Sequence, residues 1–352
     1  MTNVDINDTS GFVRQRAVSM IYYQKSSMEQ SLSQGKHLIL SLDLGGTQFR
    51  LALADEKGQL LKRYAAPIYS QQGPEQGIRR IKGAITEMLS DIDPVALRGM
   101  GVATAGLVTP GTGVLLTSPN LLSWYNTPLK GIFEQELQFP VWVGNDANLA
   151  ALGERRFGAG RGSDDLVYLT ISTGIGGGVI TGGKLLLGSS GFAAELGHMT
   201  IDLNGPRCNC GNVGCLEAMA SGTAIARLAS EKLSSGEVSV ITDLVTGDLT
   251  KVTAEVVCEA ASAGDAVACA VMHTAATNLG VGVANLVHIF NPELVIIGGG
   301  VSNAGELLFE PVRQVVAERI MPDITVRIVP AALGDNSCLL GAVALVMENT
   351  SS

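Results

Sequence analysis

Hydrophobic residues along the chain follow two spacings, one typical of strands and the other typical of helices. Short apolar runs bounded by glycine or proline predict buried strands, whereas apolar residues three or four positions apart predict helices. The predicted strands are 38–54 (two strands around a glycine turn), 59–66, 98–104, 114–118, 140–145, 165–181 (again two strands around a turn), 293–300 and 324–330. The predicted helices are 75–90, one that ends near Leu137, Asp146–Phe157, Ala266–Phe290 and Asn336–Met347. This alternation predicts an α/β fold with sheets covered on both faces.

The pattern of a strand, a glycine turn and a second strand occurs twice, at residues 38–54 and 165–181. A chain of 352 residues is too long for one ordinary core, which predicts two domains. Together these observations suggest two related lobes that face a cleft. Residues 1–36 are polar and rich in Ser and Gln. We expect them to form a loosely held extension, with one short helical stretch around Val13–Lys25.

Composition narrows the class of protein. Hydrophobic residues make up 46% of the chain and charged residues 16%, which predicts a well-packed globular protein. The net charge of −9 argues against nucleic acid as a partner, because nucleic-acid binding needs a basic face. The N-terminal residues contain no apolar run long enough for a signal peptide, and no stretch approaches the roughly 20 apolar residues that cross a membrane. We therefore expect a cytoplasmic protein with no membrane partner and with reduced cysteines.

The first glycine turn, Asp43-Leu44-Gly45-Gly46-Thr47, has the composition of a phosphate-binding site. Consecutive glycines let the backbone come close to a ligand, and the amides of such a turn can surround an anion. Asp43 could then hold a hydrated Mg²⁺ beside the phosphate. The alternative is a tight β-hairpin in which Asp43 and Thr47 satisfy the backbone. The turn by itself leaves both interpretations open.

The second glycine turn, Ser172–Gly178, fits neither of two common nucleotide-binding fingerprints. Val179 stands where the G-x-G-x-x-G pattern needs its third glycine, and a strand follows where the dinucleotide fold needs a helix. A near-match to the Walker A motif also fails, because Leu185 replaces the required Ser or Thr. The segment is more similar to the first turn, which favours a β-hairpin that binds phosphate.

Asp146 lies where a buried strand is predicted to pass into a helix. Open α/β sheets bind their ligands at this edge, beyond the carboxyl ends of the strands. An Asp in this position is most often a helix cap, but it can also be a general base directed at a substrate. Position alone favours the cap.

A metal site is the most specific prediction from the residues. His198, Cys208, Cys210 and Cys215 form a Cys₃His set with a spacing suited to tetrahedral Zn²⁺. A disulfide between Cys208 and Cys210 would close a very small, strained ring in a reducing compartment, so zinc is the favoured interpretation. Four protein ligands leave no coordination position for water, which makes the predicted metal structural and not catalytic.

Two carboxylates lie beside this loop in the sequence. Glu195 precedes His198 by three residues, and Glu217 follows Cys215 by two. A loop held by zinc would fix both carboxylates rigidly, which suits the binding of a polyhydroxylated ligand. The alternative is that both are ordinary surface charges.

With these motifs assembled, the chain resembles the ROK family of sugar kinases and repressors, and within it the bacterial glucokinases, over about residues 37–347. The most specific element is Glu195-Leu196-Gly197-His198 followed by CNCGNVGCLE at residues 208–217. The resemblance implies a two-lobed, actin-like ATPase fold (ribonuclease H-like) with a cleft between the lobes and a structural zinc loop. It implies a first lobe over 37–143, rejoined by a C-terminal helix at 335–350, and a larger second lobe over 144–334. It also suggests a homo-oligomer, either a dimer or a tetramer.

The resemblance assigns roles to single residues. It implies that two glycine turns bind the phosphates of ATP together with Mg²⁺, and that Asp146 is the base that accepts the proton of the sugar's 6-hydroxyl. The first phosphate turn would be Asp43, Gly45, Gly46 and Thr47, the second Thr173, Gly174, Gly176 and Gly177, and Gly298, Gly299 and Gly300 would lie near the adenosine. The sugar hydroxyls would be bound by Asn120, Asn145, Glu195, His198 and Glu217. One ring nitrogen of His198 would bind zinc and the other would face the sugar.

The implied function is the ATP-dependent phosphorylation of a hexose, foremost glucose to glucose 6-phosphate. Fructose, mannose, allose or an N-acetylhexosamine are alternative substrates, since the segment Ala105–Thr109 departs from the family's usual pattern on the sugar side. Gln48 is a second departure, because glucokinases commonly have Lys there. A repressor would carry a DNA-binding domain of roughly 60–80 residues, which a polar extension of 36 residues cannot form. A non-catalytic sugar-sensing protein is a further alternative, disfavoured by the presence of Asp43, Thr47 and Asp146.

Overall fold

The structure, a computed structural model, describes residues 20–23 and 37–350, with side chains from residue 37 onward. Its contacts divide the chain into two compact units. The first unit contains the described residues up to Phe157, the short segment Leu187–Ala193 and the stretch from Asn336 onward. The second unit contains Gly158–Leu186 and Ala194–Asp335.

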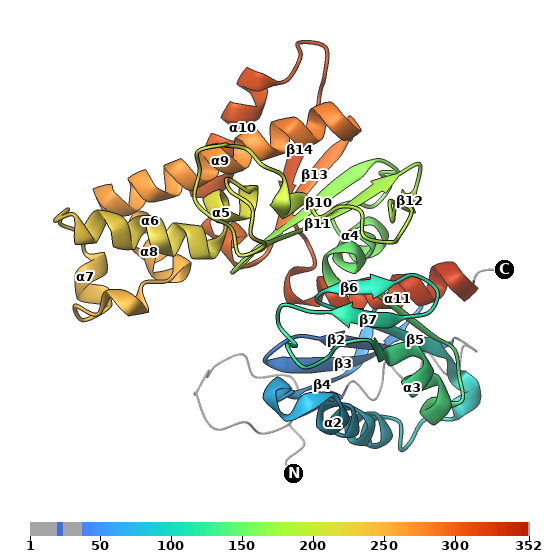
Figure 1. The fold of residues 1–352 in the computed structure, drawn as a ribbon. Helices are drawn as coiled ribbons and strands as arrows, with labels where there is room; N and C mark the ends of the chain where they lie inside the picture. The colour runs from blue at the N-terminus through green and yellow to red at the C-terminus, as the bar shows by residue number, and fades with distance from the viewer. Residues whose placement is uncertain (1–19, 24–36, 351–352) are drawn as a thin grey trace. The chain divides into compact units, whose positions relative to one another are not determined.

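The first unit is built on a six-stranded sheet with the strand order β1-β4-β3-β2-β5-β9 (Figure 1). Its strands are β1 (Met20–Tyr23), β2 (Leu38–Leu44), β3 (Gln48–Asp55), β4 (Leu60–Pro67), β5 (Leu97–Thr104) and β9 (Val141–Asn145). Strands β2, β3 and β4 form an antiparallel meander, whereas β2, β5 and β9 run parallel. Strand β2 is buried along its whole length, including the polar residues Ser41 and Asp43, as expected for a central strand of a sheet covered on both faces.

Helices cover both faces of this sheet (Figure 1). On one face lie α2 (Gly73–Met88) and α3 (Leu129–Leu137), and on the other lie α4 (Asp146–Phe157) and α11 (Ser337–Thr350). Short 3₁₀ turns occur at η1 (Ser70–Gln72) and η2 (Pro94–Ala96). A small sheet of β6 (Leu107–Thr109), β7 (Val114–Thr117) and β8 (Thr127–Pro128) completes the unit.

Glycines let helix α11 approach its neighbours closely. A Cβ added at Gly341 would lie 1.8 Å from the carbonyl oxygen of Leu149 in α4, and one at Gly101 in β5 would lie 2.1 Å from the carbonyl oxygen of Ala342. Helix α11 therefore packs tightly against both α4 and the sheet. Because of this packing α4 belongs to the first unit, whereas the sequence analysis places it at the beginning of the second lobe.

The second unit has a five-stranded sheet with the order β12-β11-β10-β13-β14. Its strands are β10 (Leu166–Ile171), β11 (Ile175–Thr181), β12 (Lys184–Leu185), β13 (Leu294–Gly298) and β14 (Arg327–Pro330). Again three strands, β10, β11 and β12, form an antiparallel meander, and β10, β13 and β14 run parallel. This order repeats that of β4-β3-β2-β5-β9, so the recurrent pattern of strand, glycine turn and strand marks two units with the same sheet topology. The α/β class is confirmed.

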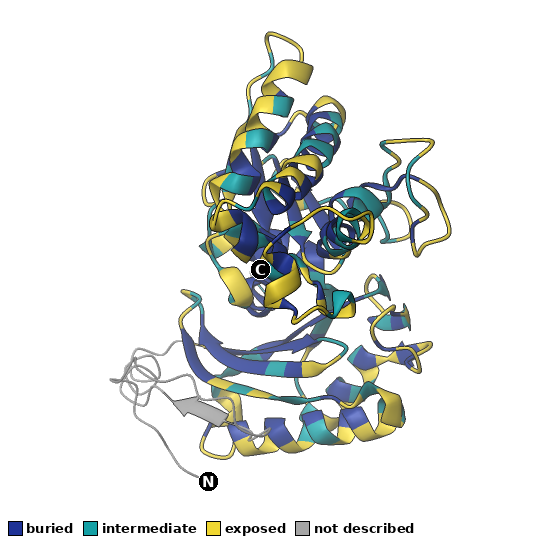
Figure 2. Ribbon diagram, turned by 90° about the vertical axis from the view of Figure 1, so that its left-hand side faces the viewer, coloured by how far each residue is buried: buried dark blue, intermediate teal, exposed yellow. Residues whose placement is uncertain are grey.

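Helix α9 (Ala266–Phe290) forms the centre of the helical part of the second unit, where it packs against α5, α6, α8 and α10. The remaining elements are η3 (Leu196–His198), α5 (Leu216–Ala220), α6 (Gly222–Ser234), α7 (Ile241–Leu244), η4 (Leu249–Lys251), α8 (Ala254–Ser262), η5 (Gly300–Ala304), α10 (Glu306–Arg319) and η6 (Gly334–Asn336). By length and composition alone α9 could cross a membrane, so the expectation that no stretch approaches such a length is wrong. It is instead a core helix, because more than half of its most apolar stretch is buried inside the protein. Figure 2 shows buried positions along the strands and exposed positions on the outer faces of the helices.

Residues Met20–Tyr23 form the edge strand of the first sheet. Strand β1 pairs antiparallel with β4, from Met20 opposite Ala65 to Tyr23 opposite Lys62. The sequence analysis suggests a short helix around Val13–Lys25, and this prediction is wrong at Met20–Tyr23. Ile and Tyr favour strands, and the free edge of β4 supplies hydrogen-bond partners that a local pattern does not reveal. The rest of the predicted helix lies outside the described residues.

Candidate functional site

The carboxyl ends of three parallel strands lie side by side at one edge of the first sheet. Leu44 of β2 pairs with Thr104 of β5, and Thr104 pairs with Asn145 of β9. The first glycine turn follows Leu44, and helix α4 begins directly after Asn145. The topology thus brings two motifs that are far apart in the sequence to the edge at which open α/β sheets bind ligands.

The first glycine turn is a tight hairpin that lies against Asn120. The amide of Gly45 donates a 3.1 Å hydrogen bond to the carbonyl oxygen of Gln48. A Cβ on Gly46 would lie 2.5 Å from the carbonyl oxygen of Asn120, so no larger residue fits. Thr47 is exposed at the tip. The hairpin interpretation is correct for the backbone, and the hairpin also brings two predicted site residues, Gly46 and Asn120, into contact.

Asp43 is buried, at 8% exposure, and forms an ion pair with Arg50 on the next strand. The Nε atom of Arg50 donates to Oδ2 of Asp43 at 2.8 Å, and a terminal guanidinium nitrogen donates to the same oxygen. Burial raises the pKa of Asp43, and the charge of Arg50 opposes this rise. The predicted Mg²⁺ ligand is therefore a buried carboxylate whose charge Arg50 balances.

Asn145 and Asp146 both bond the first turn of helix α4. The Oδ1 atom of Asn145 accepts from the amide of Asn148 at 3.1 Å, and its Nδ2 donates to the carbonyl oxygen of Gly106 at 3.2 Å. The Oδ1 atom of Asp146 accepts from the amide of Ala147 at 2.8 Å. The side chain that caps helix α4, by accepting from the amide of Asn148, is thus Asn145 and not Asp146. Asp146 is a half-buried carboxylate at a helix N-terminus, where the helix dipole favours an anion.

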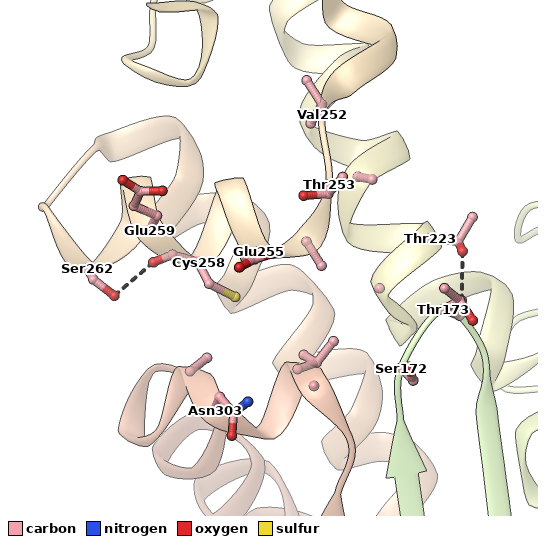
Figure 3. Close-up of a pocket in the computed structure, with 16 residues that line it drawn as sticks. Ser172, Thr173, Thr223, Val252, Thr253, Glu255, Cys258, Glu259, Ser262 and Asn303 are labelled. Atoms are coloured by element: carbon pink, nitrogen blue, oxygen red, sulfur yellow. Dashed lines mark hydrogen bonds between the residues drawn. The ribbon is translucent and has the colours of Figure 1, made fainter. Parts of the chain in front are cut away.

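The second glycine turn lines a cavity of about 840 Å³ within the second unit. Ser172 and Thr173 form one wall, and the beginning of α6, helix α8 and η5 form the others (Figure 3). Thr223 of α6 fixes the turn, since its Oγ1 donates to the carbonyl oxygen of Thr173 at 2.7 Å. The opening is large enough for a small-molecule ligand.

The glycines predicted near an adenosine lie beside this turn. Gly298 ends β13 opposite Thr170, and Gly300 lines the cavity. Gly299 has a φ of 83°, and a Cβ there would lie 2.4 Å from the carbonyl oxygen of Ile171. The close approach of the backbones therefore requires glycine at this position.

Of the residues predicted to bind the nucleotide in the second unit, Thr173 and Gly300 line the cavity, whereas Gly174, Gly176, Gly177, Gly298 and Gly299 do not. Gly176 and Gly177 lie within β11, and a Cβ on Gly177 would be 2.6 Å from the side chain of Leu196. The structure instead adds cavity residues that the sequence analysis does not identify, among them Glu255 of α8 and Asn303 of η5, which come from opposite walls in Figure 3. They belong to helices without any recognisable motif, so no local signal indicates them.

The four predicted zinc ligands are together. Their ligand atoms all lie within 4.8 Å of one another, with 3.7 Å between the sulfurs of Cys210 and Cys215 and 3.8 Å between Nδ1 of His198 and Sγ of Cys208. Two sulfurs bound at about 2.3 Å to a tetrahedral ion are about 3.8 Å apart, so the donor set and its spacing fit Zn²⁺. Because His198 directs Nδ1 toward Cys208, Nε2 is the ring nitrogen that remains for another partner.

The cysteine loop has a backbone shaped for this cluster. The amide of Cys208 donates to Asn212 at 2.8 Å, and the amide of Gly211 donates back to Cys208 at 3.0 Å. A Cβ on Gly214 would lie 1.5 Å from the carbonyl oxygen of Asp202. All six cysteines, which lie within residues 37–350, are free thiols. Burial raises the pKa of the Cys208 thiol to about 12.

The two carboxylates beside the loop differ in their surroundings. Glu195 is exposed and precedes η3, where its carbonyl oxygen accepts from the amide of His198 at 3.1 Å. Glu217 is half-buried in the first turn of α5, and its Oε2 accepts from the amide of Ile175 at 3.0 Å. Glu217 is therefore not an ordinary surface charge, because it is bonded to the second glycine turn.

The fold and this arrangement of sites place the protein in a known class. The sequence pattern of the ROK family matches residues 39–349. The chain therefore belongs to the ROK family. The family resemblance derived from the sequence is confirmed, and so is the actin-like ATPase fold that it implied.

Individual relatives include both enzymes and regulators. The chain is 42% identical to a glucokinase of Thermotoga maritima over 312 residues, which cover 88% of this chain and 97% of the relative. It is 35% identical to a putative xylose repressor of a Caldicellulosiruptor species, over 89% of this chain and 78% of the repressor. A crystal structure of a ROK family glucokinase from Streptomyces griseus, in complex with glucose and AMPPNP, has a TM-score of 0.77 at 34% identity, over 88% of this chain and 99% of that one.

Proposed function

We propose that the protein is an ATP-dependent hexose kinase that phosphorylates the 6-hydroxyl of glucose. The observation that carries this proposal is the edge of the first sheet, where a half-buried Asp146 begins α4 beside Asn145 and near a glycine turn. The similarity to two glucokinases, one of them solved with glucose and AMPPNP, supports the choice of substrate and donor. ATP would occupy the cavity between the second glycine turn, α8 and η5.

In this proposal Asp146 is the general base. It accepts the proton of the 6-hydroxyl as that oxygen forms a bond to the γ-phosphorus, and the bond from the γ-phosphorus to the ADP oxygen breaks. The bond from the Ala147 amide and the helix dipole both favour the ionised carboxylate, which is the form that can accept a proton. The transfer needs alignment and charge neutralisation more than covalent participation by the protein.

Two metals have separate roles. Mg²⁺ would neutralise charge on the phosphates of ATP, held through Asp43 beside Gly45, Gly46 and Thr47. Zn²⁺ would have four protein ligands and no place for water, so it would only hold the loop. Zinc on Nδ1 of His198 would fix the tautomer and the direction of that ring.

The proposed sugar ligands are the five residues that the family resemblance implies. They are Asn120, Asn145, Glu195, His198 and Glu217. A set of amide, carboxylate and imidazole groups suits the alternating donors and acceptors of sugar hydroxyls. We further propose that the protein acts in the cytoplasm as a homo-oligomer, either a dimer or a tetramer, a state that light scattering after size-exclusion chromatography would measure.

Two alternatives have specific support. The unusual segment Ala105–Thr109, part of which forms β6, allows another hexose such as fructose, mannose, allose or an N-acetylhexosamine. The similarity to a putative xylose repressor keeps a non-catalytic sugar-sensing protein as the second candidate. A kinase for any of these hexoses releases ADP, whereas a non-catalytic sugar-sensing protein does not.

The test is a coupled ADP-release assay across a panel of hexoses, with Asp146→Asn beside the wild type. We expect glucose to be phosphorylated, and we expect Asp146→Asn to lower kcat by about 10²–10⁴-fold with little change in the KM for sugar. The control is Asp165→Asn, because the Asp165 carboxylate is at the surface and bonds Thr181 and Gly182. Normal turnover by Asp146→Asn would refute the base assignment. Binding of a hexose without phosphorylation would establish the sugar-sensing alternative.

A further inference from the structure

The carboxylate of Glu217 connects the cysteine loop with the second glycine turn. Its Oε2 accepts from the amide of Ile175 at 3.0 Å, and its Oε1 lies 3.5 Å from the sulfur of Cys208. Glu217 and Ile175 are 42 residues apart in the chain. One side chain therefore touches a metal-ligand sulfur with one oxygen and a backbone amide of the nucleotide turn with the other.

The contact at the turn is close and requires a small residue. A Cβ on Gly174 would lie 2.4 Å from Oε2 of Glu217. On the other side, a Cβ on Gly197, which precedes the ligand His198, would lie 2.1 Å from the carbonyl oxygen of Ile175. Segments on both sides of the cysteine loop thus contact residues 174 and 175. The conformation of the turn depends on where these segments lie.

The position of Glu217 depends in turn on the metal ligands. Cys215 is the N-cap residue of α5, and Glu217 lies in the first turn of that helix. The amide of Leu216 donates to Met199 at 2.8 Å, so the helix start is tied to the residue after His198. Beyond α5 the chain continues to bond the turn, because the amide of Gly222 donates to the carbonyl oxygen of Ser172 at 2.7 Å.

We infer that Glu217 is a positioning residue through which the cysteine–histidine site controls the shape of the nucleotide turn. This inference rests on the proposed function and goes beyond the role of Glu217 as a sugar ligand. A divalent cation bound by the four ligands would fix His198 and Cys215, and Cys215 is the residue from which α5 and the Glu217 side chain start. Without the cation the start of α5 is held less firmly, and the amide of Ile175 loses a fixed acceptor. Nucleotide binding should therefore depend on Glu217 and on the metal even when no sugar is present.

The test compares Glu217→Asp with Glu195→Gln and the wild type. Asp keeps the charge but is one methylene shorter, so it cannot reach both Cys208 and Ile175. Calorimetric titration with Mg·AMPPNP in the absence of sugar measures nucleotide affinity directly, and metal analysis measures zinc. We expect Glu217→Asp to weaken nucleotide binding by about tenfold or more, as for the loss of a hydrogen bond to a charged group. The zinc content of Glu217→Asp should stay near that of the wild type.

Glu195→Gln is the matched control, because both carboxylates are proposed sugar ligands but only Glu217 contacts the turn. It should leave nucleotide affinity in the absence of sugar unchanged. Amide hydrogen exchange gives a second readout, since the Ile175 amide should exchange faster in Glu217→Asp and in wild type stripped of zinc. Equal nucleotide affinity and equal exchange at Ile175 in Glu217→Asp and wild type would refute the coupling between the metal site and the nucleotide turn, and would leave the kinase proposal intact. A wild type that binds no nucleotide would overturn the kinase proposal as well.

Discussion

Asp43 and Arg50 face each other directly across the hairpin of β2 and β3, with Nε of Arg50 2.8 Å from Oδ2 of Asp43. The side chain of Asp43 is 12% exposed and that of Arg50 27%. The carboxylate proposed to hold Mg²⁺ is thus kept in a buried place with an internal counter-charge. Such a site trades stability for function, since burying a charge costs free energy even when it is paired.

The first prediction concerns the stability of Asp43→Asn. Burial raises the pKa of Asp43 above its ordinary value of 3.8, so the native state binds this proton more readily than the unfolded state. The contribution of protonated Asp43 to the free energy of unfolding is complete below the pKa that Asp43 has in the unfolded chain. It is lost as the pH rises through the higher pKa that Asp43 has in the native state. Asn cannot ionise and avoids this loss. Asn also leaves Arg50 without its counter-charge, so we expect the Tm of Asp43→Asn relative to wild type to rise with pH, and we expect the variant to lose most Mg·ATP-dependent turnover.

Thermal unfolding followed from acidic to neutral pH checks this prediction, because the Tm of Asp43→Asn minus that of wild type should increase as the pH rises. The contrasting variant is Arg50→Met, which leaves the carboxylate without its partner. It should destabilise the protein by up to about 3 kcal/mol, less than a fully buried pair would, since Arg50 is partly exposed. Combining it with Asp43→Asn should recover most of that loss. A constant gap in Tm across pH would contradict the argument.

The second prediction concerns the metal. Cys210 is exposed, so its replacement costs little packing, but it is one of the four proposed zinc ligands. Cys210→Ser should lose most of the roughly one equivalent of zinc per chain and lower the Tm, because structural zinc binding contributes directly to folding. Metal analysis and thermal unfolding measure both effects. Cys269→Ser is the control, since Cys269 lies in α9 and donates to the carbonyl oxygen of Ala261. Full zinc content in Cys210→Ser would show that this cysteine is not a ligand.

The third prediction concerns Gly174→Ala. The backbone there allows an alanine, but the new Cβ would meet Oε2 of Glu217 at 2.4 Å. Because that oxygen ends a flexible side chain, the carboxylate should move while the fold remains. We expect an almost unchanged Tm and a nucleotide affinity several-fold below wild type, measured by titration with Mg·AMPPNP. Unchanged affinity would mean that the contact with Glu217 does not matter for the turn.

The fourth prediction is a stabilising change outside the site. Gly83 lies exposed in the middle of helix α2, with no atom within 4 Å of an added Cβ. Gly83→Ala should raise the free energy of unfolding by about 0.5–1 kcal/mol, because glycine loses more backbone entropy in a helix than alanine does. Denaturant unfolding measures the change, and hexose turnover should equal that of the wild type. A destabilised Gly83→Ala would indicate an unrecognised contact at this face of α2.

Local patterns predict much of this fold. The bounds of α9 and α4 follow from apolar spacing, and the two glycine turns follow from strands that break at consecutive glycines. The metal site is predictable as well, because four ligands of the right type within 18 residues carry the signal without any tertiary information. In each case the sequence neighbours of a residue also determine its surroundings in space.

Other features depend on distant partners and have no local signal. Strand β1 exists because β4 offers a free edge, and α10 contains Pro311, a residue that usually ends a helix. The bond between Glu217 and Ile175 joins segments that only the tertiary fold brings together. For the same reason the cavity residue Glu255 could not be predicted, whereas Thr173 could.

The close packing of α11 against α4 and β5 also determines the order in which the chain can fold. The second unit lies between α4 and α11 in the sequence, so during synthesis it emerges before the first unit can be completed. At about 5–20 residues per second, the sheet face around Gly101 waits on the order of ten seconds or more for its covering helix. The second unit is therefore synthesised before the first unit receives its last helix, so the first unit is the last to be completed.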